Sequence, residues 1–321
     1  YNSDHRSKKE IAKLLHKSER TIRREINRGL VTIRNYDWTE KTEYSAKMAQ
    51  EKYEYGMTSK GPKLKLDEDI KLVKHIEKEI IKNKKSPEVV AYQLKENGYE
   101  IEISGRTIRN AIKSGLIFEQ LEHGKIIYKK EYNNKNEKKR VSKMIPAEKS
   151  IEHRPKEANG RKVYGHWEGD LIIGKQGTKT VLFTLTERKT RQEIIMKLPN
   201  KETKTIAKAL DKIERRYGSK FYEVFKSITF DNGVEFMGYE GLEKSCLRKK
   251  KRTTIYYAHP YCSGERGTNE NNNRLIRRFI PKGTDMTNIK ISKIKEIEEW
   301  MNNYPRAMFG YKSSNMILCN I

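Results

Sequence analysis

Three short acidic strings, far apart along the chain, most constrain how it can fold. Asp170 lies within Trp167–Ile173, Asp231 within Phe230–Gly233 and Glu270 within Gly267–Asn273. The first two strings place an aspartate in or directly after an apolar run typical of a β-strand, and the third places a glutamate at the start of a helix-like stretch. The acids lie 61 and 39 residues apart, so only a fold that brings two strands and a helix together can use them as one site.

A shared site for these three carboxylates favours a divalent metal. Three carboxylates in one place repel one another and raise each other's pKa, and a cation between them removes that cost. Mg²⁺, with Mn²⁺ as the alternative, prefers such oxygen ligands, and two ions roughly 3.5 to 4 Å apart promote in-line displacement at phosphorus. The pattern predicts Asp170, Asp231 and Glu270 as catalytic and metal-ligating residues with two Mg²⁺ ions; solvated turn residues are the alternative.

The charge balance points to a polyanionic partner. Lys and Arg number 69 against 43 Asp and Glu, a formal net charge of +26. Such an excess favours nucleic acid through counterion release. We therefore expect double-stranded DNA as the partner, with no membrane and no small-molecule substrate. Lysines that only keep the protein in solution are the alternative.

From about residue 162 the pattern changes to short β-type runs. Strands are predicted over 167–173, 180–187, 193–198, 227–230 and 253–257, with a helix over 203–216 between the third and the fourth. Three adjacent strands followed by helix, strand, helix and strand form the order of an α/β ribonuclease-H-like domain, a mixed sheet flanked by helices. In that layout Asp170 and Asp231 lie on neighbouring strands.

An internal repeat occupies the N-terminal part. Residues 20–30 and 106–116 are identical at seven of eleven positions, and each copy is a basic, amphipathic helix behind a serine suited to an N-cap and before a glycine suited to a C-cap. A second apolar helix precedes each copy, so each pair is a helix-turn-helix pattern, although ordinary helical hairpins look alike. The expected DNA contacts are Arg20, Arg23, Arg24, Arg28, Arg106, Arg109 and Lys113.

The chain therefore divides into four predicted parts. Two all-α helix-turn-helix domains cover 1–58 and 63–118, a basic linker covers 119–160, and the catalytic domain covers 161–321. Residues 125–143 hold eight basic and two acidic residues, which is typical of an extended segment that follows DNA phosphates or of a solvated spacer. The first residue is Tyr1, and we expect native residues before it.

No apolar run of about 18 residues and no signal-type segment occurs, and the three cysteines are too scattered for a disulfide framework or a structural zinc site. These features predict a protein of a reducing cytoplasm.

Longer strings around the acids make a resemblance specific. Residues 165–170, 231–236, 259–261 and 267–285 resemble the IS30 family of bacterial insertion-sequence transposases, over most of 150–310. The resemblance implies that Asp170, Asp231 and Glu270 form a DDE triad that hydrolyses transposon ends and then promotes 3′-hydroxyl attack on another strand. It also implies binding to terminal inverted repeats and target DNA, and a homodimer or higher assembly that holds two ends.

Two departures from the family pattern concern the third acid. The interval between the second and third acids is some five residues longer than usual, and it contains the basic stretch 248–252. Ser263-Gly264-Glu265 replaces the usual Pro-Trp-Gln, which concerns the local loop and not the acid at Glu270. Glu265 is the rival for the third position.

Further cations follow Glu270 at helical spacing. They are expected to grip DNA near the cut site, with a solvated helix face as the alternative: Arg274, Arg277, Arg278 and Lys282.

Two other functions fit parts of the pattern. A helix-turn-helix regulator without catalysis predicts that acids are missing from the triad positions, whereas all three are present. A retroviral-type integrase predicts an N-terminal His-His-Cys-Cys zinc site, which this sequence lacks, and a plain nuclease has little use for two sequence-reading modules.

Overall fold

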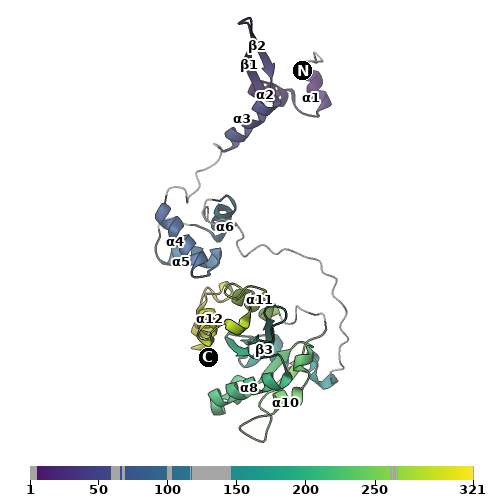
Figure 1. Cartoon of the computed structure of the whole chain (residues 1–321), viewed down its shortest axis with the longest axis vertical. Coiled ribbons are helices and arrows are strands. Elements are labelled where there is room, and N and C mark those ends of the chain that lie inside the picture. The colour runs from purple at the N-terminus through teal and green to yellow at the C-terminus, as the bar shows by residue number, and fades with distance from the viewer. Residues whose placement is uncertain are drawn as a thin grey trace. The chain divides into compact units, whose positions relative to one another are not determined.

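The computed structural model describes residues 6–58, 66, 69–99, 103–115, 117, 146–260, 262, 265 and 267–320. The chain forms two compact units, Tyr1–Ile70 and Lys71–Ile321 (Figure 1). Most of the predicted basic linker, including 125–143, lies outside the described residues. No helix in the described part of the chain is long and apolar enough to span a bilayer.

The first unit is built on the first copy of the repeat. Its elements are α1 (Lys8–Leu14), α2 (Glu19–Gly29), β1 (Leu30–Arg34), β2 (Glu40–Tyr44) and α3 (Ala46–Thr58). The side chain of Ser18 accepts a hydrogen bond from the backbone N–H of Thr21 and caps α2, as its sequence predicts. Ile22 and Ile26 bury one face of α2 against Ala12 of α1. The helix pair expected here is present.

Two features of this unit differ from the expectation. The sequence predicts an all-α domain over 1–58, but the unit contains a hairpin of β1 and β2 in which Leu30 pairs with Tyr44. Gly29 is not a left-handed C-cap either, because α2 runs through it directly into β1. A Cβ atom on Gly29 would lie 2.4 Å from the Tyr44 ring, so the glycine is needed for close packing against the hairpin.

The second copy of the repeat belongs to the second unit. The helices of this region are α4 (Ile70–Ile81), α5 (Pro87–Glu96) and α6 (Gly105–Lys113), and the repeat copy lies on α6. Ser86 and Ser104 cap α5 and α6 with their side chains, and Pro87 occupies the first turn of α5. Gly115, directly after the cap of α6, has φ +80°, so here the expected left-handed glycine is confirmed.

A five-stranded mixed sheet forms the centre of the second unit. The strands are β3 (His166–Ile173), β4 (Val181–Glu187), β5 (Glu193–Leu198), β6 (Ser227–Phe230) and β7 (Thr254–Tyr257), in the order β5-β4-β3-β6-β7. The β3–β4 and β4–β5 pairs are antiparallel, whereas β3–β6 and β6–β7 are parallel. Each strand begins within one residue of its predicted start, and the mixed sheet expected for a ribonuclease-H-like domain is confirmed.

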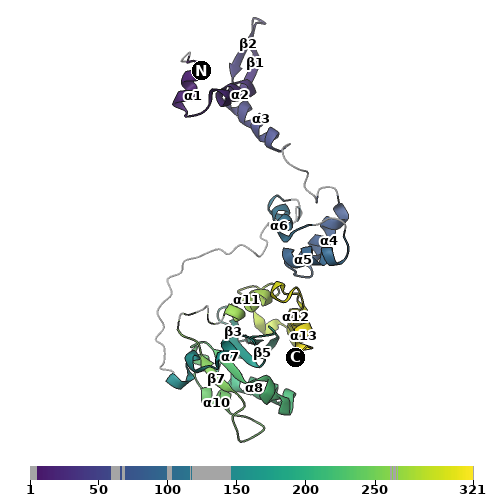
Figure 2. The same cartoon turned by 180° about the vertical axis from the view of Figure 1, so that it is seen from behind.

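Helices cover both faces of this sheet, with α8 and α10 on one side and α11 and α12 on the other (Figures 1 and 2). On the first side lie α8 (Thr203–Tyr217), α9 (Phe221–Val224) and α10 (Tyr239–Glu243), packed on a core that includes Trp167 and Phe230. On the second side lie α11 (Gly267–Ile276), α12 (Ile291–Asn303) and the short α13 (Ser314–Leu318). Residues at i and i+2 of a strand share a face, so Asp170 lies on the α11 side with Ile172, which packs against that second core.

Residues before the predicted start of the catalytic domain are also part of it. The segment 147–159 forms two 3-10 turns, Ala147–Lys149 and Ile151–His153, and α7 (Lys156–Asn159). Lys149 is buried and pairs with Glu243, and the buried Arg154 donates to the Thr229 hydroxyl at 3.0 Å. The assignment of 146–160 to a linker is therefore wrong, because buried charges tie this segment to the sheet. Other 3-10 turns span Gly218–Lys220, Val234–Phe236, Met286–Asn288 and Ala307–Phe309.

Main-chain atoms between α4 and α5 contact α12 and the end of α11. The Trp300 indole donates to the Asn83 carbonyl at 3.0 Å, and the Ser86 N–H donates to the Tyr304 hydroxyl at 3.1 Å. Val89 of α5 joins the core on the α11 side. The helices of the second repeat copy thus pack on the same compact unit as the sheet.

A buried carboxyl on the α11 side couples stability to pH. Burial raises the pKa of Glu193 to about 8, although Thr186 and Asn272 donate hydrogen bonds to its carboxylate. An unfolded glutamate titrates near 4.5, so between these values the folded state binds a proton that the unfolded state has lost.

We therefore expect the free energy of unfolding to fall by about 2 kcal/mol between pH 5 and pH 7 through this residue. Glu193→Gln keeps a side-chain oxygen that accepts both hydrogen bonds, and it should remove that share of the pH dependence. Urea unfolding at several pH values measures the effect. An unchanged slope in the variant would mean that Glu193 is ionised in the folded protein.

Candidate active site

The parallel register of β3 and β6 brings two of the predicted acids to neighbouring positions. Glu168 pairs with Thr229, and two further residues along each strand lead to Asp170 and Asp231. Adjacent strands lie about 4.8 Å apart, and both aspartates are half-buried. Gly169 directly precedes Asp170, and a Cβ atom there would come within 2.1 Å of the ring of Phe230, which directly precedes Asp231. Close backbone packing therefore supports both acids.

The loop after β6 holds the Asp231 carboxylate. The Gly233 N–H donates to Asp231 Oδ1 at 3.1 Å, and a Cβ atom on Gly233 would lie 3.0 Å from that oxygen and 2.9 Å from the Glu235 carboxyl carbon. A side chain at position 233 would therefore crowd both carboxylates. Asn232 Oδ1 is buried without a hydrogen-bond partner in the part of the chain that is described.

Helix α11 reaches the same place from the other side. The Asn273 amide donates to Asp170 Oδ2 at 2.6 Å, and the neighbouring Asn272 amide donates to Glu193 Oε2 at 2.6 Å. Glu270 lies three residues before Asn273, one turn earlier on the same helix face, and is exposed. Glu270 therefore lies on the same side of α11 as the Asn273 contact to Asp170.

The rival acid, Glu265, is committed to a different contact. His259 donates its backbone N–H to Glu265 Oε2 at 2.8 Å, and its ring Nδ1 lies 2.7 Å from Oε1. Partial burial favours a higher pKa for Glu265, but the hydrogen bonds from His259 outweigh it and hold the pKa below the usual value. The same hydrogen bond raises the pKa of His259. Both carboxylate oxygens of Glu265 are thus used in contacts with His259.

The donor atoms of the site suit a hard divalent cation. Carboxylates from Asp170, Asp231 and Glu270 are joined by the buried amide oxygens of Asn232 and Asn273, which have no hydrogen-bond partner among the described residues. Oxygen donors of this kind are the ligands that Mg²⁺ and Mn²⁺ prefer. The structure does not, however, bring the three carboxylates within 4.8 Å of one another as a set.

In the described part of the chain, the one group of acid and thiol ligand atoms that meets this distance is Asp211, Glu214 and Cys246. The Arg252 guanidinium already lies 2.7 Å from Asp211 Oδ1 and 3.3 Å from Glu214 Oε2. A protein cation therefore occupies the position that a metal would take.

A buried polar layer that the sequence did not predict lies beside the aspartates. Glu168 pairs with Arg188, and both side chains are almost fully buried. The Arg188 Nε–H also donates to the Ala158 carbonyl at 3.0 Å. His166 is also buried in this layer, and its Nδ1 lies 2.8 Å from the Ser227 hydroxyl. Burial lowers the pKa of His166. The only signal in the sequence was a glutamate two residues before Asp170, inside an otherwise apolar strand.

The predicted DNA contacts fall into two groups. Four of the seven residues on α2 and α6 are exposed and form no ion pair with a carboxylate among the described residues: Arg20, Arg24, Arg106 and Lys113. The other three, Arg23, Arg28 and Arg109, pair with acids on their own or the adjacent helix. After Glu270, Arg274 and Lys282 are exposed. Arg277 donates to the Ile173 carbonyl at 2.7 Å, and Arg278 donates to the Lys84 carbonyl. Those two guanidinium groups hold protein backbone in this structure.

Comparison with known proteins places the chain among transposases. It is 32% identical over 319 residues to the transposase for insertion sequence element IS4351 of Bacteroides fragilis, covering 96% of this chain and 89% of that protein. It is 38% identical over 171 residues to a probable transposase for the insertion-like sequence element IS1161 of Streptococcus salivarius, covering 53% of this chain and 46% of the relative. It is 32% identical over 168 residues to transposase InsI for element IS30C of Escherichia coli K12, covering 52% and 41%. The alignment thus spans about half the length of the latter two.

No family model matches the chain. Among solved structures, a simian T-cell lymphotropic virus intasome in complex with a PP2A regulatory subunit has a TM-score of 0.32 at 17% identity, over 44% of this chain and 49% of that one. That similarity is too low to support an argument. The relatives decide the assignment: the chain belongs to the family of insertion-sequence transposases that includes the IS30 transposases InsI.

Proposed function

We propose that this transposase binds the terminal inverted repeats of an insertion sequence and catalyses metal-dependent strand cleavage and 3′-hydroxyl strand transfer. The observation that supports the proposal most strongly is the β3–β6 register, which makes Asp170 and Asp231 neighbours, together with the Asn273 contact that brings α11 to Asp170. Two such strand carboxylates and a glutamate on an adjoining helix suit phosphoryl transfer on DNA.

In this proposal Asp170, Asp231 and Glu270 hold two Mg²⁺ ions, with Mn²⁺ as a substitute. Bound divalent ions supply Lewis-acid polarisation of the scissile phosphate and a more acidic water or 3′-hydroxyl. Asn273 orients the Asp170 carboxylate through its amide, and the Gly233 N–H orients that of Asp231. The Glu168–Arg188 pair keeps the backbone before Asp170 fixed.

DNA recognition is assigned to the two helix pairs, α1–α2 and α5–α6, as helix-turn-helix modules. Their second helices bury isoleucines and carry arginines and lysine on the solvent side, which suits entry into a major groove. Contacts near the cut site are assigned to the exposed Arg274 of α11 and to the exposed Lys282 after it. Target DNA and a second copy of the chain complete the assembly, in the bacterial cytoplasm at the nucleoid.

Metal removal tests the proposal directly. With a labelled duplex that carries the element's end and with Mg²⁺, we expect nicking at the end and joining of the 3′-hydroxyl to another duplex. Without divalent metal, in EDTA, both products should disappear while the end duplex is still bound. Gel separation of cleaved and joined strands measures the outcome.

A duplex with a scrambled end serves as the control and should give neither product. Cleavage that continues in EDTA, or that is equal on the scrambled duplex, would refute the proposed function.

A further inference from the structure

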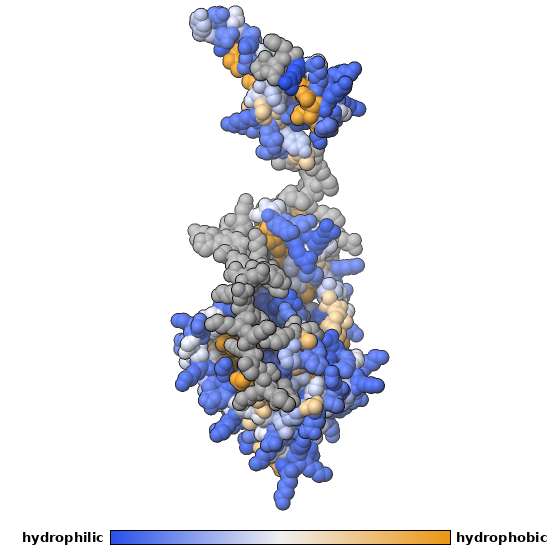
Figure 3. Space-filling view, turned by 90° about the vertical axis from the view of Figure 1, so that its right-hand side faces the viewer, coloured by the Kyte–Doolittle hydropathy of each residue, from blue (hydrophilic) through white to orange (hydrophobic). Residues whose placement is uncertain are grey.

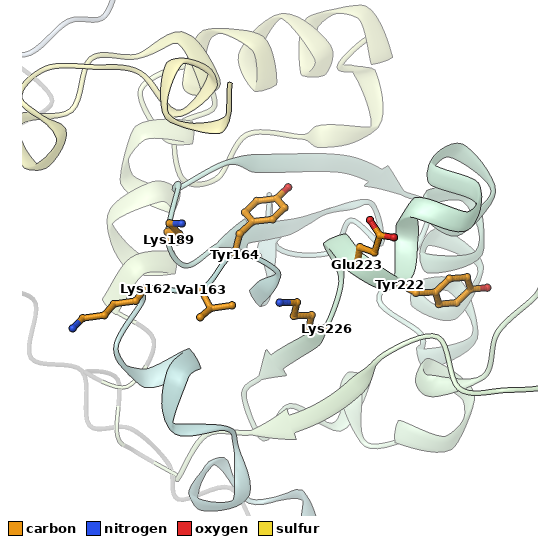
Figure 4. Close-up of a pocket in the computed structure, with 7 residues that line it drawn as sticks. All are labelled: Lys162, Val163, Tyr164, Lys189, Tyr222, Glu223 and Lys226. Atoms are coloured by element: carbon orange, nitrogen blue, oxygen red, sulfur yellow. The ribbon is translucent and has the colours of Figure 1, made fainter. Parts of the chain in front are cut away.

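An open cavity lies at the edge of the sheet where β3 and β6 begin. Its volume is about 650 Å³, and Figure 4 shows its lining residues: Lys162, Val163, Tyr164, Lys189, Tyr222, Glu223 and Lys226. Lys226 directly precedes β6, whereas Asp231 directly follows it. Because β3, β6 and β7 are parallel, this edge lies opposite the edge that carries Asp231. The cavity is therefore separate from the candidate active site.

A basic loop before β7 begins at the same edge. It spans 244–252, and its ends are closed by an antiparallel bridge between Lys244 and Lys251. Arg252, with its side chain buried, anchors one end on Asp211 and Glu214. At the other end, Ser245 Oγ accepts the backbone N–H of Arg248 at 3.0 Å. The base of the loop is thus well ordered while the tip, residues 247–250, is exposed.

Tyr222 joins the loop to the cavity. The Arg248 guanidinium lies over the Tyr222 ring, 3.0 Å from its centroid, and Tyr222 lines the cavity. The Tyr222 hydroxyl donates to Glu214 Oε1 at 2.9 Å, so the ring is held by the same carboxylate that anchors Arg252. Cavity and loop form one surface, which we call the basic edge: Lys162, Lys189, Lys226, Arg248, Lys249 and Lys250.

The charge of the basic edge is not compensated by the protein. Among the described residues none of its six cations has an ion-pair partner, and Glu223 is the acid that lines the cavity beside them. Nearby cations show the contrast, because Lys251 pairs with Glu243 and Arg252 with Asp211. Hydrophilic side chains also dominate the face of the molecule in Figure 3. The six cations of the basic edge, three at the cavity and three at the loop tip, repel one another, and a bound polyanion relieves that repulsion.

We infer that the basic edge binds the phosphate backbone of a second stretch of duplex DNA, on the side of the sheet away from the candidate active site. The inference rests on the proposed function for the identity of the polyanion. Its cations come from four separate segments and spread from the cavity to the loop tip, which suits successive phosphates along a strand better than one small anion. The bound duplex is either a transposon end or target DNA, and both offer the same phosphates.

Salt dependence of DNA binding by the full chain tests the inference. In the test variant Lys162, Lys226, Lys249 and Lys250 are replaced with Gln. The matched control replaces Lys201, Lys204, Lys208 and Lys212, four exposed lysines on and before α8. Fluorescence anisotropy gives Kd for an end duplex and for an unrelated duplex over a range of salt concentrations, and thermal unfolding checks that each variant is folded.

Each phosphate contact contributes about 0.9 to the slope of log Kd against log salt. We expect the test variant to lose about 3 from that slope and the control less than about 1. A loss on the end duplex alone identifies the ligand as a transposon end, and a loss on the unrelated duplex identifies target DNA; either supports the inference. A wild-type slope on both duplexes, or an equal loss in the control, overturns it.

Failure here can be told from failure of the proposed function. Wild-type slopes in the test variant, alongside metal-dependent cleavage by the unaltered protein, reject the basic edge and leave the transposase chemistry standing. If the test variant loses salt dependence but the unaltered protein cleaves no DNA, the basic edge is supported and the proposed transposase chemistry is rejected.

Discussion

Asp231→Asn should lower strand cleavage and strand transfer by a factor on the order of 10³ or more while leaving DNA binding unchanged. The replacement keeps the shape of the side chain, and the Gly233 N–H can still donate to its oxygen. It removes one negative charge from the predicted metal ligands, and a 10³-fold loss corresponds to about 4 kcal/mol of transition-state stabilisation. Cleavage assays and gel shifts on the same end duplex measure the two quantities.

Glu270 and Glu265 provide an internal comparison. Glu270→Gln should match the loss seen in Asp231→Asn, because Glu270 shares the face of α11 with Asn273. Glu265→Gln keeps an oxygen for the His259 N–H and should retain cleavage within about tenfold, as expected for a residue that only supports a loop. Full activity in Glu270→Gln, with loss in Glu265→Gln, would transfer the third position to Glu265.

Glu168→Ala should destabilise the second unit by about 3 to 5 kcal/mol, because it leaves the Arg188 guanidinium buried without its carboxylate. The side chains of Glu168 and Arg188 are 0% and 4% exposed, so water does not replace the lost partner. Urea unfolding followed by tryptophan fluorescence measures the change, since Trp167 is the adjacent residue on β3.

A surface pair in the same unit is the control. Lys293 and Glu296 on α12 are 47% and 64% exposed, and Lys293→Ala should change stability by less than about 1 kcal/mol. Replacing both Glu168 and Arg188 with apolar residues of similar size should recover much of the loss. A Glu168→Ala protein as stable as the Lys293→Ala control would show that the buried pair contributes nothing.

Short-range patterns in the sequence were enough to predict the sheet. Apolar runs of four to eight residues located all five strands, and the order of strands and helices predicted a mixed sheet in which the strands of Asp170 and Asp231 are neighbours. The serine caps at Ser18, Ser86 and Ser104 are equally local, since each depends on a backbone N–H three residues away. These features are encoded within a few residues.

What the sequence did not predict depends on partners far away in the chain. The hairpin of β1 and β2 lacks the alternation of a half-buried strand, since both strands are mostly exposed. The buried charged groups come together only in the folded unit, so no sequence spacing predicts their contacts: Arg154, Glu168 and Arg188. At the candidate site, the sequence predicted the three acids. It did not predict that Asn273 donates a hydrogen bond to Asp170 or that Glu265 pairs with His259, because these partners are brought together only by the fold.

The segment between α4 and α5 is held through atoms that every amino acid carries. Trp300 and Arg278 bind carbonyl oxygens of Asn83 and Lys84, and the Tyr304 hydroxyl accepts an N–H from Ser86. In the proposed function α6 reads DNA, and substitutions on its exposed face then leave these main-chain contacts in place. Under that proposal, DNA preference can change in evolution without disturbing the packing of this segment on α12.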